Sequence, residues 1–116
     1  MSESKATVAE YMDGFRAGDH GRILSCLTDD VEWEIPGTFL VRGKAAFDER
    51  IEDEGFVGRP GITVTRMTEQ GDVVVAEGSV RTQRKDGAML TLAFCDVFEM
   101  RDGKIRRLVS YLMEVK

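Results

Sequence analysis

The chain has 116 residues, of which 42% are hydrophobic and 32% are charged. This length predicts a single domain over residues 1–116, with a hydrophobic core and no room for a second domain. Sixteen Lys and Arg residues stand against 21 Asp and Glu residues, and the net charge of −5 argues against nucleic acid or an anionic membrane surface as a partner. No apolar run approaches the roughly 20 residues of a membrane span.

The N-terminus and the cysteines indicate a compartment. The first residues, Met-Ser-Glu-Ser-Lys, are polar and do not form the apolar core of a signal peptide. Cys26 and Cys95 fall in different predicted elements, and their spacing matches no metal-ligand motif. We therefore predict two reduced, mostly buried thiols in a cytoplasmic protein that needs no metal and no cofactor.

The first predicted element is an amphipathic helix. Its apolar residues recur at helical spacing, and they are Val8, Tyr11, Met12 and Phe15. Ser2 or Ser4 is expected to cap its start, and Gly18 to end it. Gly14 lies inside this helix, where glycine costs about 1 kcal/mol relative to alanine. We therefore expect a close backbone contact at Gly14.

A second, shorter helix is predicted after Asp19, its N-cap. It carries Ile23, Leu24 and Leu27. His20, the only histidine, lies at the start of this helix beside Asp19. We therefore expect His20 on the surface and no histidine-dependent catalytic triad.

A half-buried strand is predicted over residues 31–35, where apolar side chains alternate with Glu32 and Glu34. The strand ends at Pro36-Gly37, and residues 39–41 form a short extended piece. Successive side chains of a strand lie on opposite faces, so only one face of this strand can face the core.

A third helix is predicted to follow Gly43 and to close at Gly55. Phe47 and Ile51 lie on its inner side. Arg59-Pro60-Gly61 is predicted to be a turn that breaks the chain.

Beyond this break the chain is predicted to be all strand, over residues 62–69, 73–84, 88–100 and 105–115. The turns between the strands are marked by Gly71-Asp72, Lys85-Asp86-Gly87 and Arg101-Asp102-Gly103. Helices followed by antiparallel strands predict an α+β fold, in which three helices cover the concave face of a curled antiparallel sheet. Such a cover leaves a pocket.

Asp96 is the most informative residue of the chain. Every second side chain of its strand is large and apolar except Asp96, and these neighbours are Leu90, Leu92, Phe94, Phe98 and Met100. Alternate residues of a strand share a face, so the pattern directs the Asp96 carboxyl group into the pocket. Burial of an unpaired carboxylate raises its pKa. A protonated acid in an apolar cavity can donate a hydrogen bond to a carbonyl group.

The register of the last hairpin decides which residues share the pocket with Asp96. A glycine-bulge turn at Arg101-Asp102-Gly103 places Leu108 opposite Asp96, with Ser110 and Leu112 on the same face. A tight two-residue turn instead brings Val109, Tyr111 and Met113 to that face.

The hairpin at Asp86-Gly87 has the same ambiguity. The bulged form places four small or apolar residues on the pocket side, namely Val74, Ala76, Gly78 and Val80. The tight form sets Glu77 opposite Asp96. We favour the bulged register at both turns, because it pairs Val74 with Phe98 and Val80 with Leu92. The opposite face is then apolar, which predicts a homodimer interface of Ala93, Cys95, Val97, Val109, Tyr111 and Met113.

Three stretches, residues 11–19, 30–37 and 96–105, together with the order of elements, carry a family resemblance. The chain resembles the SnoaL-like branch of the nuclear transport factor two-like superfamily, which includes ketosteroid isomerases and polyketide cyclases. The resemblance spans nearly the whole chain. It implies one cone-shaped, cystatin-like α+β barrel domain that is usually dimeric.

The resemblance also implies roles for single residues. Tyr11 matches the isomerase tyrosine that donates a hydrogen bond to the substrate oxygen, and Asp96 matches the acid kept protonated by an apolar site. The aspartate that shuttles the proton in those isomerases falls at Ile35. Glu34 is adjacent to it but points to the other side of a regular strand. Ser110 occupies a place where limonene epoxide hydrolase-like members carry an acid.

Two functions stay open on the sequence. One is an isomerase or cyclase that acts on an apolar, carbonyl-bearing molecule, with Tyr11 and protonated Asp96 holding the oxyanion and with Glu34, a water or a substrate group as the base. The alternative is a non-catalytic ligand-binding or dimeric scaffold module. The predicted pocket wall is Phe15, Trp33, Ile35, Phe47, Phe94, Phe98, Leu108 and Ser110.

Overall fold

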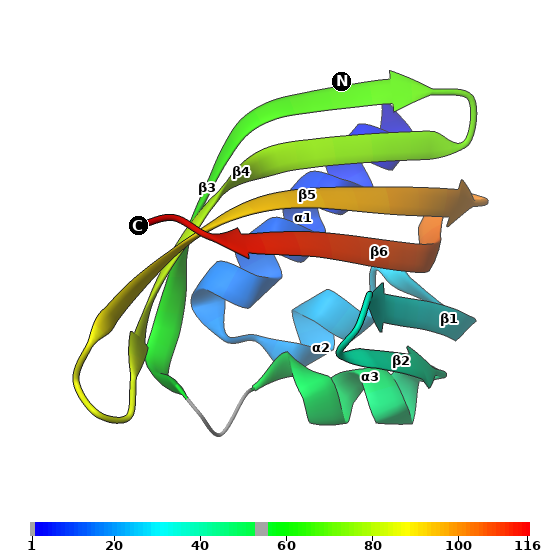
Figure 1. Cartoon of the computed structure of the whole chain (residues 1–116). Coiled ribbons are helices and arrows are strands. Elements are labelled where there is room, and N and C mark those ends of the chain that lie inside the picture. Colours follow the sequence, from blue (N-terminus) through cyan, green and yellow to red (C-terminus); the bar gives the residue numbers. More distant parts are fainter. Residues whose placement is uncertain (1, 53–55) are drawn as a thin grey trace.

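Three helices packed on one side of a curled six-stranded sheet make up the fold over residues 2–52 and 56–116, the part of the chain that the computed structural model describes (Figure 1). The elements in chain order are α1 Glu3–Ala17, α2 His20–Leu24, β1 Leu27–Ile35, β2 Phe39–Arg42, α3 Lys44–Ile51, β3 Phe56–Gln70, β4 Val73–Arg84, β5 Met89–Arg101 and β6 Lys104–Glu114. The predicted α+β class and its three helices over a curled sheet are confirmed.

The sheet is unclosed and mixed. Its strand order is β2-β1-β6-β5-β4-β3, so β2 and β3 are the edges. Neighbouring strands pair antiparallel except β1 and β6, which run parallel and place Trp33 beside Leu108. The expectation of a wholly antiparallel sheet is therefore wrong for this one pair, and the sheet does not close into the barrel that the resemblance implied. The parallel pair joins the first and last strands, which local hairpin signals cannot reveal.

The caps of α1 and α2 lie where the sequence places them. The Ser2 hydroxyl accepts a backbone N–H at 3.1 Å, and Gly18 ends α1 in the left-handed region with φ 65°. Asp19 caps α2. A Cβ atom at Gly14 would lie 2.9 Å from Ile23 Cγ1. The predicted close contact at Gly14 is thus the packing of α1 on α2.

Three boundaries differ from the prediction or fall outside what is described. Leu27 begins β1 instead of extending α2, because it pairs with β6. Arg59-Pro60-Gly61 does not break the chain but lies inside β3, where a register shift against β4 absorbs the extra residues. An edge strand tolerates proline, which lacks a backbone N–H. Helix α3 ends at Ile51, and the predicted stop at Gly55 lies outside the described residues.

The hairpin between β4 and β5 has the bulged register that the sequence favours. Val74 pairs with Phe98 and Val80 with Leu92. Gly87 supplies the left-handed residue of the turn, with φ 90°. Glu77 therefore pairs with Cys95 and not with Asp96.

The hairpin between β5 and β6 corrects the predicted register. Asp102 and Gly103 form a tight turn, with φ 52° and 76°. One extra residue, Arg106, then bulges from β6 and returns the expected side chains to the concave face. The direct partner of Asp96 is consequently Ser110, whereas the prediction placed Leu108 opposite it.

The core lies between the helices and the concave face of the sheet. Its largest fully buried side chains are Phe47, Phe98, Ile23, Ile105, Leu108, Val8, Val31 and Val74. Trp33 stacks on Phe47 with ring centroids 4.5 Å apart. Within the described ranges, the helices are too short or too polar to cross a membrane.

Candidate functional site

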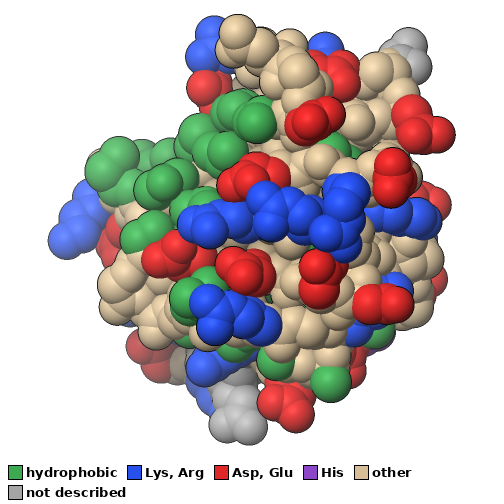
Figure 2. Space-filling view, turned by 90° about the vertical axis from the view of Figure 1, so that its right-hand side faces the viewer, with side chains coloured by type: hydrophobic (Ala, Val, Ile, Leu, Met, Phe, Trp, Pro, Cys, Tyr) green, Lys and Arg blue, Asp and Glu red, His purple; other side chains and the backbone are tan. Residues whose placement is uncertain are grey.

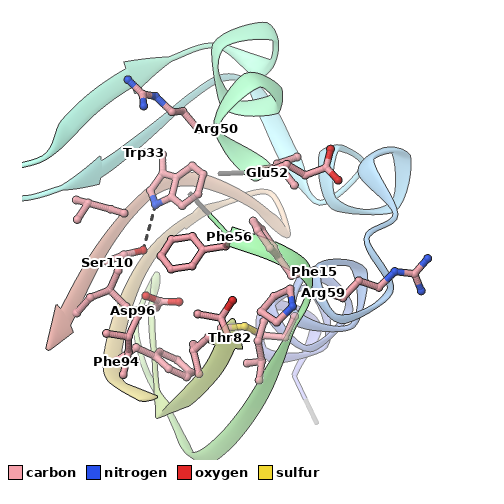
Figure 3. Close-up of a pocket in the computed structure, with 18 of the residues that line it drawn as sticks. Phe15, Trp33, Arg50, Glu52, Phe56, Arg59, Thr82, Phe94, Asp96 and Ser110 are labelled. Carbon is pink, nitrogen blue, oxygen red and sulfur yellow. Dashed lines mark hydrogen bonds between the residues drawn. The ribbon is translucent and has the colours of Figure 1, made fainter. Parts of the chain in front are cut away.

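A pocket of about 390 Å³ opens between α1, α3 and the concave face of the sheet (Figure 3). Six of the side chains that line it are aromatic, namely Tyr11, Phe15, Trp33, Phe39, Phe56 and Phe94. Aliphatic side chains of β3, β4, β5 and β6 complete most of the wall. The size and the apolar lining are those of a small-molecule site.

Asp96 lies in the wall of this pocket, and its carboxyl group points into the cavity (Figure 3). On β5 it stands between Ala76 of β4 and Ser110 of β6. Burial raises the pKa of Asp96 to about 7, although a hydrogen bond with Ser110 opposes the rise. Asp96 is therefore an acid that gains or loses its proton near neutral pH.

Ser110 joins Asp96 to Trp33. The Trp33 Nε1–H donates a hydrogen bond to Ser110 Oγ over 3.1 Å, between two buried side chains (Figure 3). Ser110 is also the direct cross-strand partner of Asp96. The three residues come from three adjacent strands, β1, β6 and β5.

Tyr11 reaches the same pocket from α1 and is 3% exposed. Its ring lies 5.1 Å from that of Phe15 and 5.5 Å from that of Phe98, centroid to centroid. Burial, and then the charge of Asp96, raise the pKa of Tyr11 well above its ordinary value. The hydroxyl group thus keeps its proton at neutral pH and can donate a hydrogen bond.

The predicted pocket wall divides into two groups. The residues that line the cavity are Phe15, Trp33, Ile35, Phe94 and Ser110. The residues that do not line it are Phe47, Phe98 and Leu108, which are fully buried. Strand alternation gives the face of a residue but not its depth. Tyr11, which lines the cavity, packs edge-on against the buried ring of Phe98.

Glu34 does not reach the pocket. It lies on the opposite face of β1 from Ile35, and its Oε1 is 3.3 Å from Arg107 Nη2. Arg107 also lies 3.8 Å from Glu32 and 3.4 Å from Glu99, so these carboxylates surround one guanidinium. The interpretation of Glu34 as a displaced base is therefore wrong, because its carboxylate lies on the face of β1 away from the pocket. Ile35 itself lines the pocket and offers no base.

The outer surface carries interspersed charges. On the side of the molecule shown in Figure 2, Lys and Arg side chains form a row with Asp and Glu side chains above and below it. The net negative charge is therefore not gathered into one acidic patch on this side.

The sequence interpretation missed four polar residues of the pocket, which are Arg50, Glu52, Arg59 and Thr82 (Figure 3). The Arg50 guanidinium lies over the Phe39 ring, 4.7 Å from its centroid. Two of the four had a signal. Thr82 continues the pocket-facing row of β4 by one step beyond Val80. Arg50 lies one helical turn beyond Phe47 and so shares its face.

His20 lies outside the pocket and bridges α2 to α3. Its Nδ1 lies 2.6 Å from Asp48 Oδ1, and its Nε2 lies 3.1 Å from Glu52 Oε2. The hydrogen bond with Asp48 is the main cause of a raised pKa of His20. This position fits a structural link on the surface.

The cysteines and the acidic residues form no metal centre in residues 2–52 and 56–116, where no group of three His, Cys, Asp or Glu side chains is arranged to hold an ion. Cys26 is buried and Cys95 half-buried, and both are free thiols. Burial raises the pKa of each thiol, so both are protonated at neutral pH.

Solved structures share this fold. TerC, co-crystallised with polyporic acid, is 30% identical over 94% of this chain and 90% of its own, with a TM-score of 0.86. An LEH-like epoxide hydrolase of M. tuberculosis is 22% identical over 96% of this chain and 83% of its own, with a TM-score of 0.83. A ketosteroid isomerase candidate from Kribbella flavida DSM 17836 is 23% identical over 98% and 80%, with a TM-score of 0.77. The last two likenesses show the fold alone.

A comparison with curated proteins found no match. The sequence model of the SnoaL-like domain matches residues 8–108, which is most of the chain. That range includes Tyr11, Trp33 and Asp96, and it confirms the resemblance seen in the sequence. The protein belongs to the SnoaL-like domain family.

Proposed function

We propose that this protein binds an apolar small molecule with a carbonyl group and converts it by enolate chemistry, as an isomerase or a cyclase does. The observation that carries the proposal is the Asp96 carboxyl group, which faces an aromatic cavity and has a pKa of about 7 because of its burial. In its neutral form Asp96 donates a hydrogen bond to the ligand oxygen. Tyr11, in the same wall, supplies the second donor.

The chemistry follows from where charge develops. When a proton leaves the carbon next to the carbonyl group, the electron pair moves to the oxygen, which becomes negative. Hydrogen bonds from Tyr11 and neutral Asp96 strengthen at that moment, and each donor contributes roughly 3–4 kcal/mol in comparable sites. Because Glu34 is outside the pocket, we assign the base to a water molecule or to a group of the ligand. The proton is then returned to a second carbon or the enolate attacks an electrophilic carbon.

The TerC structure supports a small-molecule ligand. TerC shares 30% of its residues with this chain and was co-crystallised with polyporic acid. The cavity of about 390 Å³ lies within the size range of small-molecule sites.

Ligand binding can be read from Trp33, the only tryptophan of the chain, which lies in the pocket wall. We expect aromatic and polycyclic enones to change its fluorescence. Asp96→Val removes the donor and should weaken binding at least tenfold, whereas Asp96→Asn keeps an N–H donor of similar size. The parent protein should lose affinity above about pH 7 as Asp96 ionises, and Asp96→Asn should not.

Turnover is tested on the same compounds by following the ultraviolet band of the enone. Tyr11→Phe and Asp96→Val should each abolish conversion. Binding that depends on Asp96 without any conversion would support the non-catalytic ligand-binding module instead. Equal affinity of the parent and Asp96→Val at every pH would contradict both functions.

A further inference from the structure

Three side chains stand in a row across the concave face of the sheet. Trp33 of β1, Ser110 of β6 and Asp96 of β5 occupy adjacent strands, and Asp96 and Ser110 are direct cross-strand partners. The Trp33 Nε1 atom lies 3.1 Å from Ser110 Oγ, the contact drawn as a dashed line in Figure 3. Ser110 is 5% exposed, so protein atoms surround its hydroxyl group almost completely.

The direction of these hydrogen bonds is fixed by chemistry. An indole N–H can only donate, so Ser110 Oγ is the acceptor toward Trp33. A serine hydroxyl group has one hydrogen of its own, which is then left for the neighbouring carboxyl group of Asp96. An ionised carboxylate can only accept. Donation from indole to hydroxyl to carboxylate is cooperative, because each bond polarises the next.

We infer that Trp33 and Ser110 are positioning residues, which orient one hydroxyl hydrogen onto Asp96 and thereby favour its ionised form. The inference rests on the proposed function in one respect, that Asp96 is the acid of the site. It assigns the two residues a role beyond the pocket wall. Burial raises the pH above which Asp96 no longer offers a proton to a ligand, and in this inference the two residues together lower it.

Other charged groups near Asp96 stay unchanged in the test. Tyr11 of α1 lines the same pocket, and the charge of Asp96 contributes to the raised pKa of its hydroxyl group. Three further charged residues line the pocket, namely Arg50 of α3, Glu52 just after α3 and Arg59 of β3. Cys95 is the neighbour of Asp96 on β5, and the charge of Asp96 contributes to the raised pKa of the Cys95 thiol. Variants at Trp33 and Ser110 therefore change hydrogen bonding without adding or removing a charge.

The experiment is a titration of the ligand-free protein by NMR of the aspartate carboxyl carbons. Ser110→Ala should move the pKa of Asp96 upward by about one unit, since a hydrogen bond to a charged group is lost. Ser110→Thr keeps the hydroxyl group and should restore most of the parent value. Trp33→Phe keeps a ring against Phe47 and should give a smaller upward shift.

The double variant decides whether the relay exists. If Trp33 acts through Ser110, Trp33→Phe should have no further effect on Asp96 in the Ser110→Ala background. An unchanged or lower Asp96 pKa in Ser110→Ala would overturn the inference, as would equal effects of Trp33→Phe in both backgrounds. If Trp33→Phe does not fold, the Ser110→Ala and Ser110→Thr pair settles the role of Ser110.

The outcome is distinct from that of the proposed function. The titration needs no ligand and no turnover, so a protein that converts nothing can still show the relay. Conversely, a parent Asp96 that titrates near the reference value of about 4 removes the neutral donor and with it the proposed function. The difference between the parent and Ser110→Ala would still test the relay in that case.

Discussion

Gly78 lies directly opposite Phe94 on β4 and β5, and the space beside Gly78 is filled by its neighbours. A Cβ atom there would lie 2.9 Å from Phe94 Cε2 and 1.9 Å from the backbone oxygen of Thr63. The missing side chain therefore lets β3 approach β4 closely. It also lets the Phe94 ring lie against the sheet as part of the pocket wall.

Gly78→Ala should destabilise the protein by about 1–3 kcal/mol, because a methyl group would overlap backbone that cannot rotate away. Urea unfolding measures the change. Gly21→Ala is the matched control, since a Cβ atom there meets Asp19 Oδ1 at an ordinary 3.7 Å. We expect Gly21→Ala to be neutral or slightly stabilising. Equal stability of the two variants would contradict the packing described for Gly78.

Asp96 should make the protein less stable as the pH rises. Its pKa is about 7 in the folded state and about 4 when unfolded, so the folded state binds the proton more tightly. Stability falls between about pH 4 and pH 7 and is level above that window. The loss is on the order of a few kcal/mol. We expect Asp96→Asn to gain stability relative to the parent between about pH 5 and pH 8.

That comparison uses urea unfolding of both proteins at the two pH values. Other titrating groups are common to parent and variant, so their contributions cancel in the difference. A difference that does not change with pH would mean that Asp96 is already ionised at pH 5.

His20 should also contribute stability that falls as the pH rises, but the cause is a hydrogen bond and not burial. Its pKa is raised by the hydrogen bond with Asp48, so its contribution is complete below the unfolded value of about 6.5 and is lost as the pH rises through the folded value. His20→Gln should therefore cost more at about pH 5.5 than at about pH 8.5, by less than about 1 kcal/mol for so exposed a pair. Lys44→Gln, which removes the exposed Lys44–Asp29 pair, should show no such dependence.

The convex face should hold a second copy of the chain. Tyr111 and Met113 of β6 are 52% and 69% exposed, beside Cys95 and Ala93 of β5. An apolar row of this kind on a sheet is typical of an interface. Sedimentation equilibrium should give twice the mass of one chain, and Met113→Glu should give the single mass. Leu40→Glu, at a 49% exposed residue of the edge strand β2, should leave the dimer intact.

The inward direction of Asp96 could be predicted because it depends on one strand alone. Alternation along β5 fixes the face, and the glycine-bulge turn before β5 fixes the partners on β4. The bulge at Arg106 has no such local signature, since the preceding Asp102-Gly103 turn is regular. Arg106 forms an ion pair with Glu99 across the hairpin, which only the assembled strands bring together. Ser110 was consequently placed on the right face but not opposite Asp96.

Other features of the site depend on packing between distant segments. The parallel pairing of β1 with β6 brings Trp33 to Ser110, and the two residues lie 77 positions apart in the chain. Arg59 reaches the pocket because its segment continues β3 along the sheet edge, whereas proline and glycine beside it resemble a turn. Residue type predicted the apolar character of the wall. How deeply a side chain is buried depends on the packing of the helices on the sheet. The sequence alone therefore could not show that Phe47 and Leu108 lie behind the cavity wall.

Because β2 and β3 end the sheet without pairing to each other, side chains of α3 and of the first part of β3 complete the wall of the pocket. Replacing Arg50 or Arg59 changes one side chain of the pocket wall and breaks no backbone hydrogen bond between strands. Asp96 and Ser110, by contrast, sit on inner strands that are held on both flanks. Substitutions at the rim can therefore change the shape of the pocket entrance without disturbing the strands that hold Asp96.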